Sequence, residues 1–297
     1  MAGKSFSPLR YPGGKNCLAD FLADLATRNG LTGGSYVEMY AGGSGAALSL
    51  LFRGVFSDIY INDFDYHIYS LWYSILNHST TFINKILQTD ISVKEWKRQQ
   101  NVYEHGRDAD IVDVGFATFF LNRTNRSGII HKAGPIGGMD QSGNYKIDVR
   151  FNKRELIRRI ESIAERRNDI FLTNLDAISV LKNLPRYIPD LENVLIYLDP
   201  PYYNKGGQLY LNNYKHCDHL ALAETISRYL GDLHWLVSYD NVKEIKEMYH
   251  QYRMSSFDLN YTLQSKRFGS ELLIFSNVSN IGQEITVNRR TSLLTII

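Results

Sequence analysis

The sequence predicts an α/β protein in which helices cover one open, mostly parallel sheet. Short apolar runs of strand-forming residues alternate with segments whose apolar residues recur three and four positions apart. A glycine-rich turn at residues 40–45 joins one such strand to a helix, and the run 194–198 stops at two prolines. Ligands bind such sheets at the carboxyl ends of the strands, so we expect the functional site there.

Composition and charge exclude several classes of protein. The 297 residues suffice for one elaborated domain or two small ones. Lys plus Arg total 33 against 31 Asp plus Glu, so a polyanionic partner would have to meet a local basic face. Cys17 and Cys217 are too few for a disulfide framework, which suits a reducing compartment. Without a signal peptide or an apolar run of membrane length, we expect a soluble, cytoplasmic protein.

The amino-terminal loop, residues 7–15, combines prolines, glycines and Lys15 ahead of a predicted helix at 18–25. A glycine-rich loop before a helix could bind phosphate. This one lacks the Gly-x-x-x-x-Gly-Lys-Ser/Thr pattern, which argues against a nucleoside triphosphate site.

The first strand, predicted at 35–39, leads through the glycine-rich turn into a helix at 46–51. This order starts a Rossmann-like unit, in which missing β-carbons let the backbone approach a ligand. The glycine spacing does not fit the dinucleotide fingerprint, which argues against NAD. The next strand, 58–65, ends in acids. Asp63 is placed to accept both hydroxyls of a ribose, and Asp65 to cap the following helix.

Residues 66–167 interrupt this alternation of strands and helices. Helical periodicity is found at 68–76, 82–87, 93–103, 111–121 and 156–163. Between the last two lies a polar, glycine-rich, basic loop, 122–139, that is too long for a simple connection. Loops of this length carry function more often than they fill space.

The strand pattern then resumes and completes a sheet of seven strands. The remaining strands are predicted at 170–173, 194–198, 235–238, 254–257 and 272–275, with a helix at 220–229. The loop 203–216, rich in Gly, Asn and Tyr, should close over the site. The tail, 279–297, has no role that we can assign.

The fourth strand ends in Asp-Pro-Pro-Tyr at 199–202. Its prolines cannot donate to a sheet ladder, so Asp199 and the Pro200 carbonyl are presented at the carboxyl end of the strand. A carboxylate and a carbonyl offer two acceptors to the two hydrogens of an exocyclic amine, and Tyr202 can stack on the attached ring. Taken alone, the motif could also be a turn that merely ends a strand.

Asp-Pro-Pro-Tyr is also the signature of amino-methyltransferases acting on nucleobases, and the chain resembles the Dam-type (D12 class) DNA adenine-N6 methyltransferases. Four motifs in the family's order carry the resemblance from residue 9 to about residue 275. They are aromatic-x-Gly-Gly-Lys at 11–15, with Tyr for the usual Trp; Phe-x-Gly-x-Gly near 40–45, with Ser44 at the second Gly; Asn-Arg at 122–123, where the basic loop begins; and Asp-Pro-Pro-Tyr at 199–202.

The resemblance implies a Rossmann-like class I methyltransferase fold with a seven-stranded mixed sheet, whose last strand is antiparallel. It divides the chain into a catalytic domain that binds S-adenosylmethionine, at 1–65 and 168–278, and a mainly helical target-recognition insert at 66–167. The tail, 279–297, falls outside both.

The resemblance also implies the site residues. Cofactor contacts fall on Tyr11, Lys15, Glu38, Gly42, Asp63, Asp176 and Asp199, and catalysis on Asp199, Pro200, Pro201 and Tyr202. Within the basic loop, Arg pairs with guanine and Asn with adenine, so the candidates for DNA contacts are Asn122, Arg123, Asn125, Arg126 and Lys132. We expect no metal, since His216, Cys217 and His219 have no second ligand cluster nearby in the sequence.

The implied reaction is methylation of an adenine swung out of double-stranded DNA. Asp199 and the Pro200 carbonyl hold the amine for a direct in-line displacement without a covalent intermediate. The alternatives are methylation of cytosine N4, whose family more commonly has Ser at position 199, and a DNA-binding regulator without turnover. A cognate restriction endonuclease stays open, a monomer is the default, and the implied setting is a prokaryotic or phage-infected cytoplasm without membrane attachment.

Overall fold

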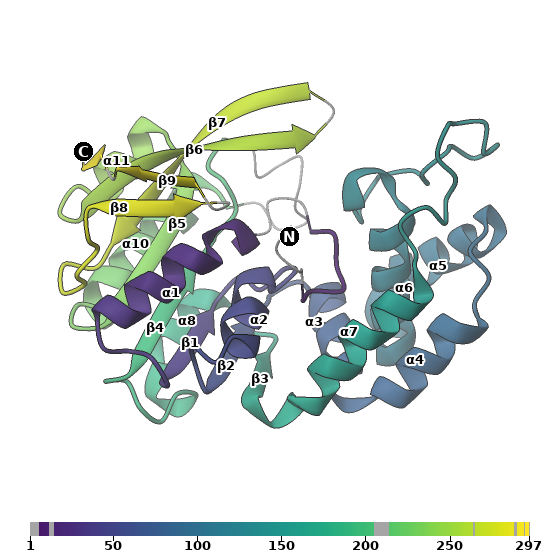
Figure 1. Ribbon diagram of the computed structural model, residues 1–297, viewed down its shortest axis with the longest axis horizontal. Coiled ribbons are helices and arrows are strands. Elements are labelled where there is room, and N and C mark those ends of the chain that lie inside the picture. Colours follow the sequence, from purple (N-terminus) through teal and green to yellow (C-terminus); the bar gives the residue numbers. More distant parts are fainter. Residues whose placement is uncertain are drawn as a thin grey trace.

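The computed structural model describes residues 6–11, 15–204, 214–263, 265–287, 290–293 and 295–296. Within them the main sheet has eight strands in the order β10-β6-β7-β5-β4-β1-β2-β3 (Figure 1). The strands are β1 (Ser35–Glu38), β2 (Asp58–Asn62), β3 (Ile170–Thr173), β4 (Val194–Leu198), β5 (His234–Asp240), β6 (Arg253–Leu263), β7 (Ser265–Phe275) and β10 (Thr295–Ile296). The first seven confirm the predicted strands, and β10 adds a two-residue edge.

Parallel pairing joins β3, β2, β1, β4 and β5, whereas β7 runs antiparallel between β5 and β6. The expected mixed sheet is therefore confirmed. Residues of β1 and β4 are buried throughout because helices cover both faces of the sheet. All carboxyl ends of the parallel strands consequently meet at one edge, where the sequence places Asp63 and Asp199.

The helices form two layers. They are α1 (Ala19–Arg28), α2 (Gly45–Phe52), α3 (Tyr66–Asn77), α4 (Ser79–Gln88), α5 (Val93–His105), α6 (Ile111–Thr124), α7 (Lys153–Glu165), α8 (Ala177–Lys182), α10 (His216–Tyr229) and α11 (Lys243–Met248), with a 3₁₀ turn η1 (Lys15–Leu18) before α1. One apolar core lies between the sheet and the first helices, and the other beneath α8, α10 and α11. Alternate residues of β4 point into each, Tyr197 into the first and Ile196 into the second.

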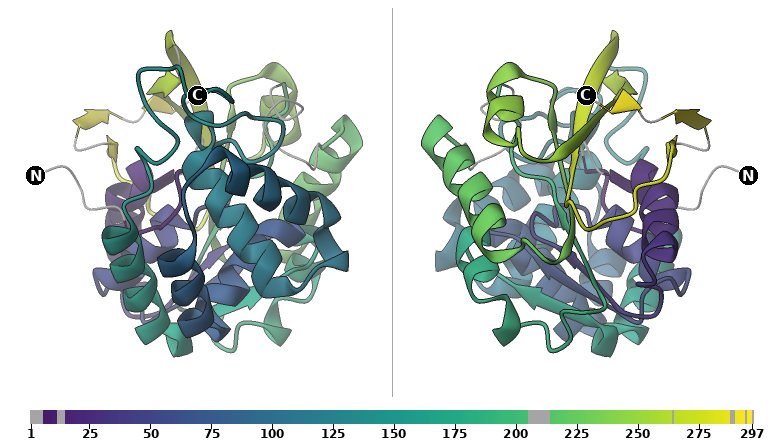
Figure 2. Two further views of the ribbon diagram at one scale, coloured as in Figure 1. Left: turned by 90° about the vertical axis from the view of Figure 1, so that its right-hand side faces the viewer. Right: turned by 90° about the vertical axis from the view of Figure 1, so that its left-hand side faces the viewer.

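Helices α3 to α7 lie between β2 and β3 in the sequence and beside the sheet in space (Figures 1 and 2). Asp65 caps α3 as predicted, because its carboxylate accepts the His67 amide at 2.8 Å. Helix α6 is buried on nearly all sides and packs against α3 and α5. That this helical region is the DNA recognition unit stays a prediction.

The tail, whose structure we could not predict, forms strands. β8 (Glu284–Val287) and β9 (Arg290–Leu293) pair antiparallel, and β10 pairs antiparallel with β6 at the sheet edge. Of the loop expected to close over the site, residues 205–213 lie outside the described residues.

Candidate active site at the carboxyl edge of the sheet

A cavity of about 450 Å³ opens where β1, β2 and β4 end. It brings together six predicted site residues from distant parts of the chain, one of which is Pro201 of the strand-ending motif. The other five are Tyr11, Gly42, Asp63, Asp176 and Asp199. Residues 128–131 of the basic loop form part of the same wall. The cavity therefore lies between the sheet edge and the helical insert.

Asp199 follows β4 and is held by two neighbours. Its Oδ1 accepts the Ser238 hydroxyl at 2.6 Å and lies 3.1 Å from the Lys15 ammonium. Ser238 is in turn 2.8 Å from the Tyr197 hydroxyl, so the two central strands fix the carboxylate from below. Among the described residues no hydrogen bond reaches Oδ2, and the side chain keeps 17% exposure. Burial raises the pKa of Asp199, and the positive charge of Lys15 opposes that effect.

Lys15 is buried and joins the Asp-Pro-Pro-Tyr motif to β7. Its ammonium donates to the Tyr202 hydroxyl at 3.0 Å and lies 3.3 Å from Glu271 Oε1. Burial alone would lower the pKa of Lys15, but the carboxylates of Asp199 and Glu271 outweigh it and raise that pKa well above its usual value. Lys15 therefore stays charged, as the counter-ion of the buried Glu271 carboxylate and the half-buried Asp199 carboxylate.

Tyr202 is buried, and its hydroxyl also donates to Glu271. It is absent from the cavity lining, as is Pro200, while Pro201 contributes to the wall. Tyr203 and Asn204, which follow, donate their amides to the Asp240 carboxylate. The Tyr202 hydroxyl is therefore bonded to both Lys15 and Glu271. Stacking of its ring on a base stays a prediction.

Two further predicted acids lie around the glycine-rich turn, Glu38 buried and Asp63 half-buried. Asp63 accepts the amides of Gly42 and Asp65 at 2.8 and 2.9 Å. Burial, with Asp65 nearby, raises the pKa of Asp63 to about 7. Glu38 accepts the Ala47 amide in the first turn of α2, and burial followed by the charge of Asp199 raises its pKa to about 8. Both groups are thus poised to change charge near neutrality.

The glycine-rich turn needs glycine because Tyr11 packs onto it. A β-carbon on Gly42 would lie 2.6 Å from the Tyr11 ring, and Gly42 has φ of +45°. Ser44, at the position of the family's second glycine, takes the left-handed conformation with φ of 45° just before α2. Asp176 caps α8 by accepting the Ser179 amide, and it also lines the cavity.

The structure corrects the expected DNA contacts of Asn122 and Asn125, because both side chains are fully buried. The Asn122 amide accepts the backbone N–H of Arg10 and donates to the carbonyls of Arg10 and Gly128. The Asn125 amide accepts the Trp96 indole and donates to two loop carbonyls. Helix α6 runs on to Thr124, which places these polar residues inside the protein. Both amides therefore hold the loop and cannot reach a base.

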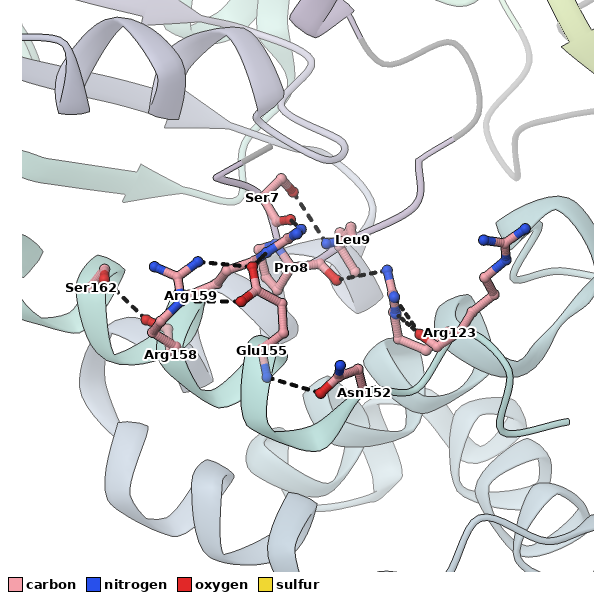
Figure 3. A network of polar contacts seen from close by, with 10 residues as sticks. Ser7, Pro8, Leu9, Arg123, Asn152, Glu155, Arg158, Arg159 and Ser162 are labelled. Atoms are coloured by element: carbon pink, nitrogen blue, oxygen red, sulfur yellow. Dashed lines mark hydrogen bonds and ion pairs between the residues drawn. The ribbon is translucent and has the colours of Figure 1, made fainter. Parts of the chain in front are cut away.

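Arg123 is partly buried, and its side chain bonds to backbone groups of the protein (Figure 3). Its guanidinium donates to the carbonyls of Arg150 and Pro8. Burial, followed by the charges of Arg10, Arg159 and Arg150, lowers the pKa of Arg123 to about 9. These four arginines thus form a crowded positive cluster.

Arg126 and Lys132 are exposed, so of the five predicted DNA contacts only these two lie fully at the surface.

Sequence reasoning missed several residues of the site. Phe64 follows Asp63 and keeps 59% exposure although it lines the cavity; Ile178, Tyr214 and Asp218 line it too. The signal for Phe64 was its position directly after a strand-ending acid. Ser238 and Glu271 gave no signal, since each lies within an apolar strand pattern far from the motif in sequence.

Among the residues that the structure describes, we find no group of three or more His, Cys, Asp or Glu side chains that could hold a metal. Within the same residues, none of the helices combines the length and the apolar character needed to cross a membrane.

The sheet order, with an antiparallel β7 between β5 and β6 and a cavity at the carboxyl edge, defines a Rossmann-like methyltransferase. Residues 11–263, nearly the whole chain, match the family described as D12 class N6 adenine-specific DNA methyltransferase. The chain belongs to this family, and it is a DNA adenine-N6 methyltransferase.

No curated protein matches the chain. Similar solved structures include a conserved hypothetical protein of Streptococcus pyogenes, with 12% identity, a TM-score of 0.34, and coverage of 84% of this chain and 89% of that one. They also include the rRNA methyltransferase AviRa of Streptomyces viridochromogenes, with 12% identity, a TM-score of 0.36, and coverage of 90% and 86%. Likenesses this weak carry no argument about function.

Proposed function

We propose that this enzyme moves the methyl group of S-adenosylmethionine to the N6 amine of an adenine flipped out of double-stranded DNA, at one short sequence. The observation that carries the proposal is the cavity itself. Asp63, Asp199 and residues 128–131 of the insert all line it. A ribose-binding acid, an amine-binding acid and a basic loop are thereby joined in one site.

The cofactor fits the donor groups along β1 and β2. Each Asp63 oxygen already accepts one backbone amide and has a second lone pair for a ribose hydroxyl. Phe64 and Ile178 offer apolar surfaces for the adenine ring, beside Asp176. Gly42 lines the cavity, and Glu38 lies close enough to Asp199 for their charges to interact, so we assign the methionine part to this region. When bound, the cofactor supplies a methyl group on a positively charged sulfonium.

The charges around Asp199 suit a cation. The carboxylate of Asp199 lies at the cavity and is half-buried. Its negative charge is partly shielded from water, so it attracts a sulfonium more strongly than it would in bulk solvent. The same charge favours the positively charged methyl donor over its neutral thioether product.

Asp199 is arranged to receive one more hydrogen bond. Ser238 and Lys15 occupy Oδ1, which leaves Oδ2 to accept a hydrogen of the target amine. Pro200 lies outside the cavity lining, so its carbonyl is assigned as second acceptor from the sequence motif alone. As nitrogen attacks the methyl group, positive charge develops on the amine, and the fixed carboxylate stabilises it. A stacked adenine cannot reach this position, so the base must flip, at a cost of about a few kcal/mol.

The basic loop supplies the DNA-binding face. Arg126 and Lys132 are exposed on it, and the crowded guanidinium groups of Arg10, Arg123 and Arg150 lie beside it. A backbone phosphate next to these arginines would relieve their mutual repulsion. We therefore assign target recognition to residues 66–167, and catalysis to 1–65 with 168–278.

We expect the affinity for S-adenosylmethionine to rise with pH through neutrality. The pKa of Asp63 is about 7, and its carboxylate form is the better acceptor for ribose hydroxyls. Raising the pH from about 6 to about 8 should tighten binding roughly tenfold, as measured by calorimetry. Glu38, whose pKa is about 8, contributes a second and later step. In Asp63→Asn the first step should vanish; an unchanged pH dependence in that variant would contradict the assignment.

Replacing Arg126 with alanine should weaken DNA binding without affecting the cofactor. A lost base contact costs about 1–3 kcal/mol and relaxes the sequence preference, whereas a lost phosphate contact lowers the salt slope by about one. Titrations of a specific and a scrambled duplex at several salt concentrations distinguish these cases. Arg186→Ala, an exposed arginine beyond α8, is the matched control. Equal binding by both variants means that Arg126 lies outside the DNA interface.

Base-resolution sequencing of plasmid DNA from cells expressing the enzyme tests the proposal as a whole. We expect methylated adenine at one short motif, and purified enzyme should label a duplex carrying it from S-adenosylmethionine. Methylated cytosine, or label in RNA but not in the duplex, would overturn the proposed substrate.

A further inference from the structure

We propose that Glu271 is a positioning residue for methyl transfer. It holds the Lys15 ammonium and the Tyr202 hydroxyl so that Asp199 keeps one carboxylate oxygen for the target amine. This inference rests on the proposed function and adds to it a residue that lies outside all four sequence motifs.

The antiparallel strand β7 brings Glu271 to the site. Glu271 pairs with Asp240 at the carboxyl end of β5, where the pairing of these two strands stops. Its side chain is only 2% exposed. A carboxylate is rarely this buried unless it is paired, because leaving water costs several kcal/mol. Its position therefore calls for a specific partner, and Lys15 is that partner.

Both donors converge on one oxygen. The Lys15 ammonium lies 3.3 Å from Glu271 Oε1, which also accepts the Tyr202 hydroxyl. The same ammonium lies 3.1 Å from Asp199 Oδ1. Glu271 therefore shares the positive charge of Lys15 with Asp199. Without that sharing, Asp199 would carry the whole ion pair and would be a weaker acceptor for the amine.

Glu271 also holds the strand-ending motif in place. Tyr202 comes two residues after Pro200, whose carbonyl is the second acceptor in the proposed reaction. With its hydroxyl bonded to Glu271 and Lys15, Tyr202 restricts the path of the backbone just after Asp199. A fixed path matters because a displacement of about 1 Å at the reacting atoms can cost a hundredfold in rate.

The test is Glu271→Gln, which keeps a hydrogen-bond acceptor and removes the charge. Under saturating substrates we expect kcat to fall roughly tenfold to a hundredfold, while KM for DNA and the affinity for S-adenosylmethionine change little. The acid limb of the kcat–pH profile should also move to lower pH, because the charge of Glu271 raises the pKa of Asp199. A merely structural role would lower the active fraction without moving that limb.

Three further variants complete the experiment. Tyr202→Phe should show part of the loss in kcat, and the double variant should be no slower than Glu271→Gln alone, because both act through one network. Glu271→Asp should restore the wild-type acid limb. Glu244→Gln, an exposed acid on α11, should match the wild type throughout.

An unchanged kcat and acid limb in Glu271→Gln would overturn the inference, as would a loss confined to substrate binding. If Glu271→Gln does not fold, a wild-type kcat in Tyr202→Phe overturns it instead. Absence of methyl transfer by the wild-type enzyme would instead count against the proposed function.

Discussion

Replacing Asp199 with alanine is expected to lower the rate of methyl transfer by at least about a thousandfold. Asp199 is the carboxylate that lies at the cavity with one oxygen directed by Ser238 and Lys15. Removing it takes away both the acceptor that orients the amine and the charge that stabilises the developing cation; loss of one such preorganised group costs about a hundredfold to a thousandfold, and loss of orientation adds to it. A radiolabelled methyl-transfer assay measures the effect.

DNA binding by Asp199→Ala should stay close to that of the wild type, because the proposed DNA contacts lie on the insert. Lys15 keeps Glu271 as counter-ion in this variant, so the fold should persist. A gel-shift titration and a thermal melt provide these controls. More than a trace of methyl transfer by the variant would show that another group holds the amine.

The second large effect concerns stability. Lys15→Met should lower the free energy of unfolding by about 3–5 kcal/mol at pH 7, because it removes the buried cation that pairs with the half-buried carboxylate of Asp199 and the buried one of Glu271. Lys15 lowers the pKa of Asp199, so removing it raises that pKa further. The deficit should therefore grow as pH rises and shrink as pH falls through the raised pKa of Asp199, where this carboxylate takes up a proton. Denaturant titrations at several pH values measure it.

Lys85→Met is the matched control for this prediction. Lys85 pairs with Asp113 at the surface, with side-chain exposures of 32% and 47%. Exposed pairs contribute about 0–1 kcal/mol, so this variant should remain near the wild type at every pH. If Lys15→Met is no less stable than Lys85→Met, the buried network does not stabilise the fold.

Much of the sheet could be predicted from the sequence because its strands are short apolar runs ended by glycine, proline or acids. Asp63 and Asp199 follow from the same logic, since the tips of parallel strands share one edge. The order in which β5, β6 and β7 pair within the sheet could not be predicted this way. Periodicity gives the residues of β7, but its place between β5 and β6 depends on long-range pairing, and with it the arrival of Glu271 at the site.

The loop residues were harder to interpret. Asn122 and Asn125 precede a glycine-rich stretch, where polar side chains are usually exposed. Helix α6 is buried on nearly all sides, however, and these amides satisfy backbone groups that would otherwise lack partners. Nothing in their local sequence distinguishes an amide that binds backbone from one that binds a base.

The hydrogen bonds between the insert and the amino-terminal segment, residues 7–15, affect how recognition specificity could be exchanged between relatives. The Asn122 side chain accepts the backbone N–H of Arg10 and donates to its carbonyl. Arg123 donates to the Pro8 carbonyl, and Arg159 donates to the Ser7 carbonyl. A few residues further on, the same segment supplies Tyr11 to the cavity and Lys15 to Asp199. The insert is therefore not a structurally independent unit. A chimera that receives the insert of a relative must therefore also receive the amino-terminal segment of that relative. Otherwise we expect Lys15 to be displaced from Asp199.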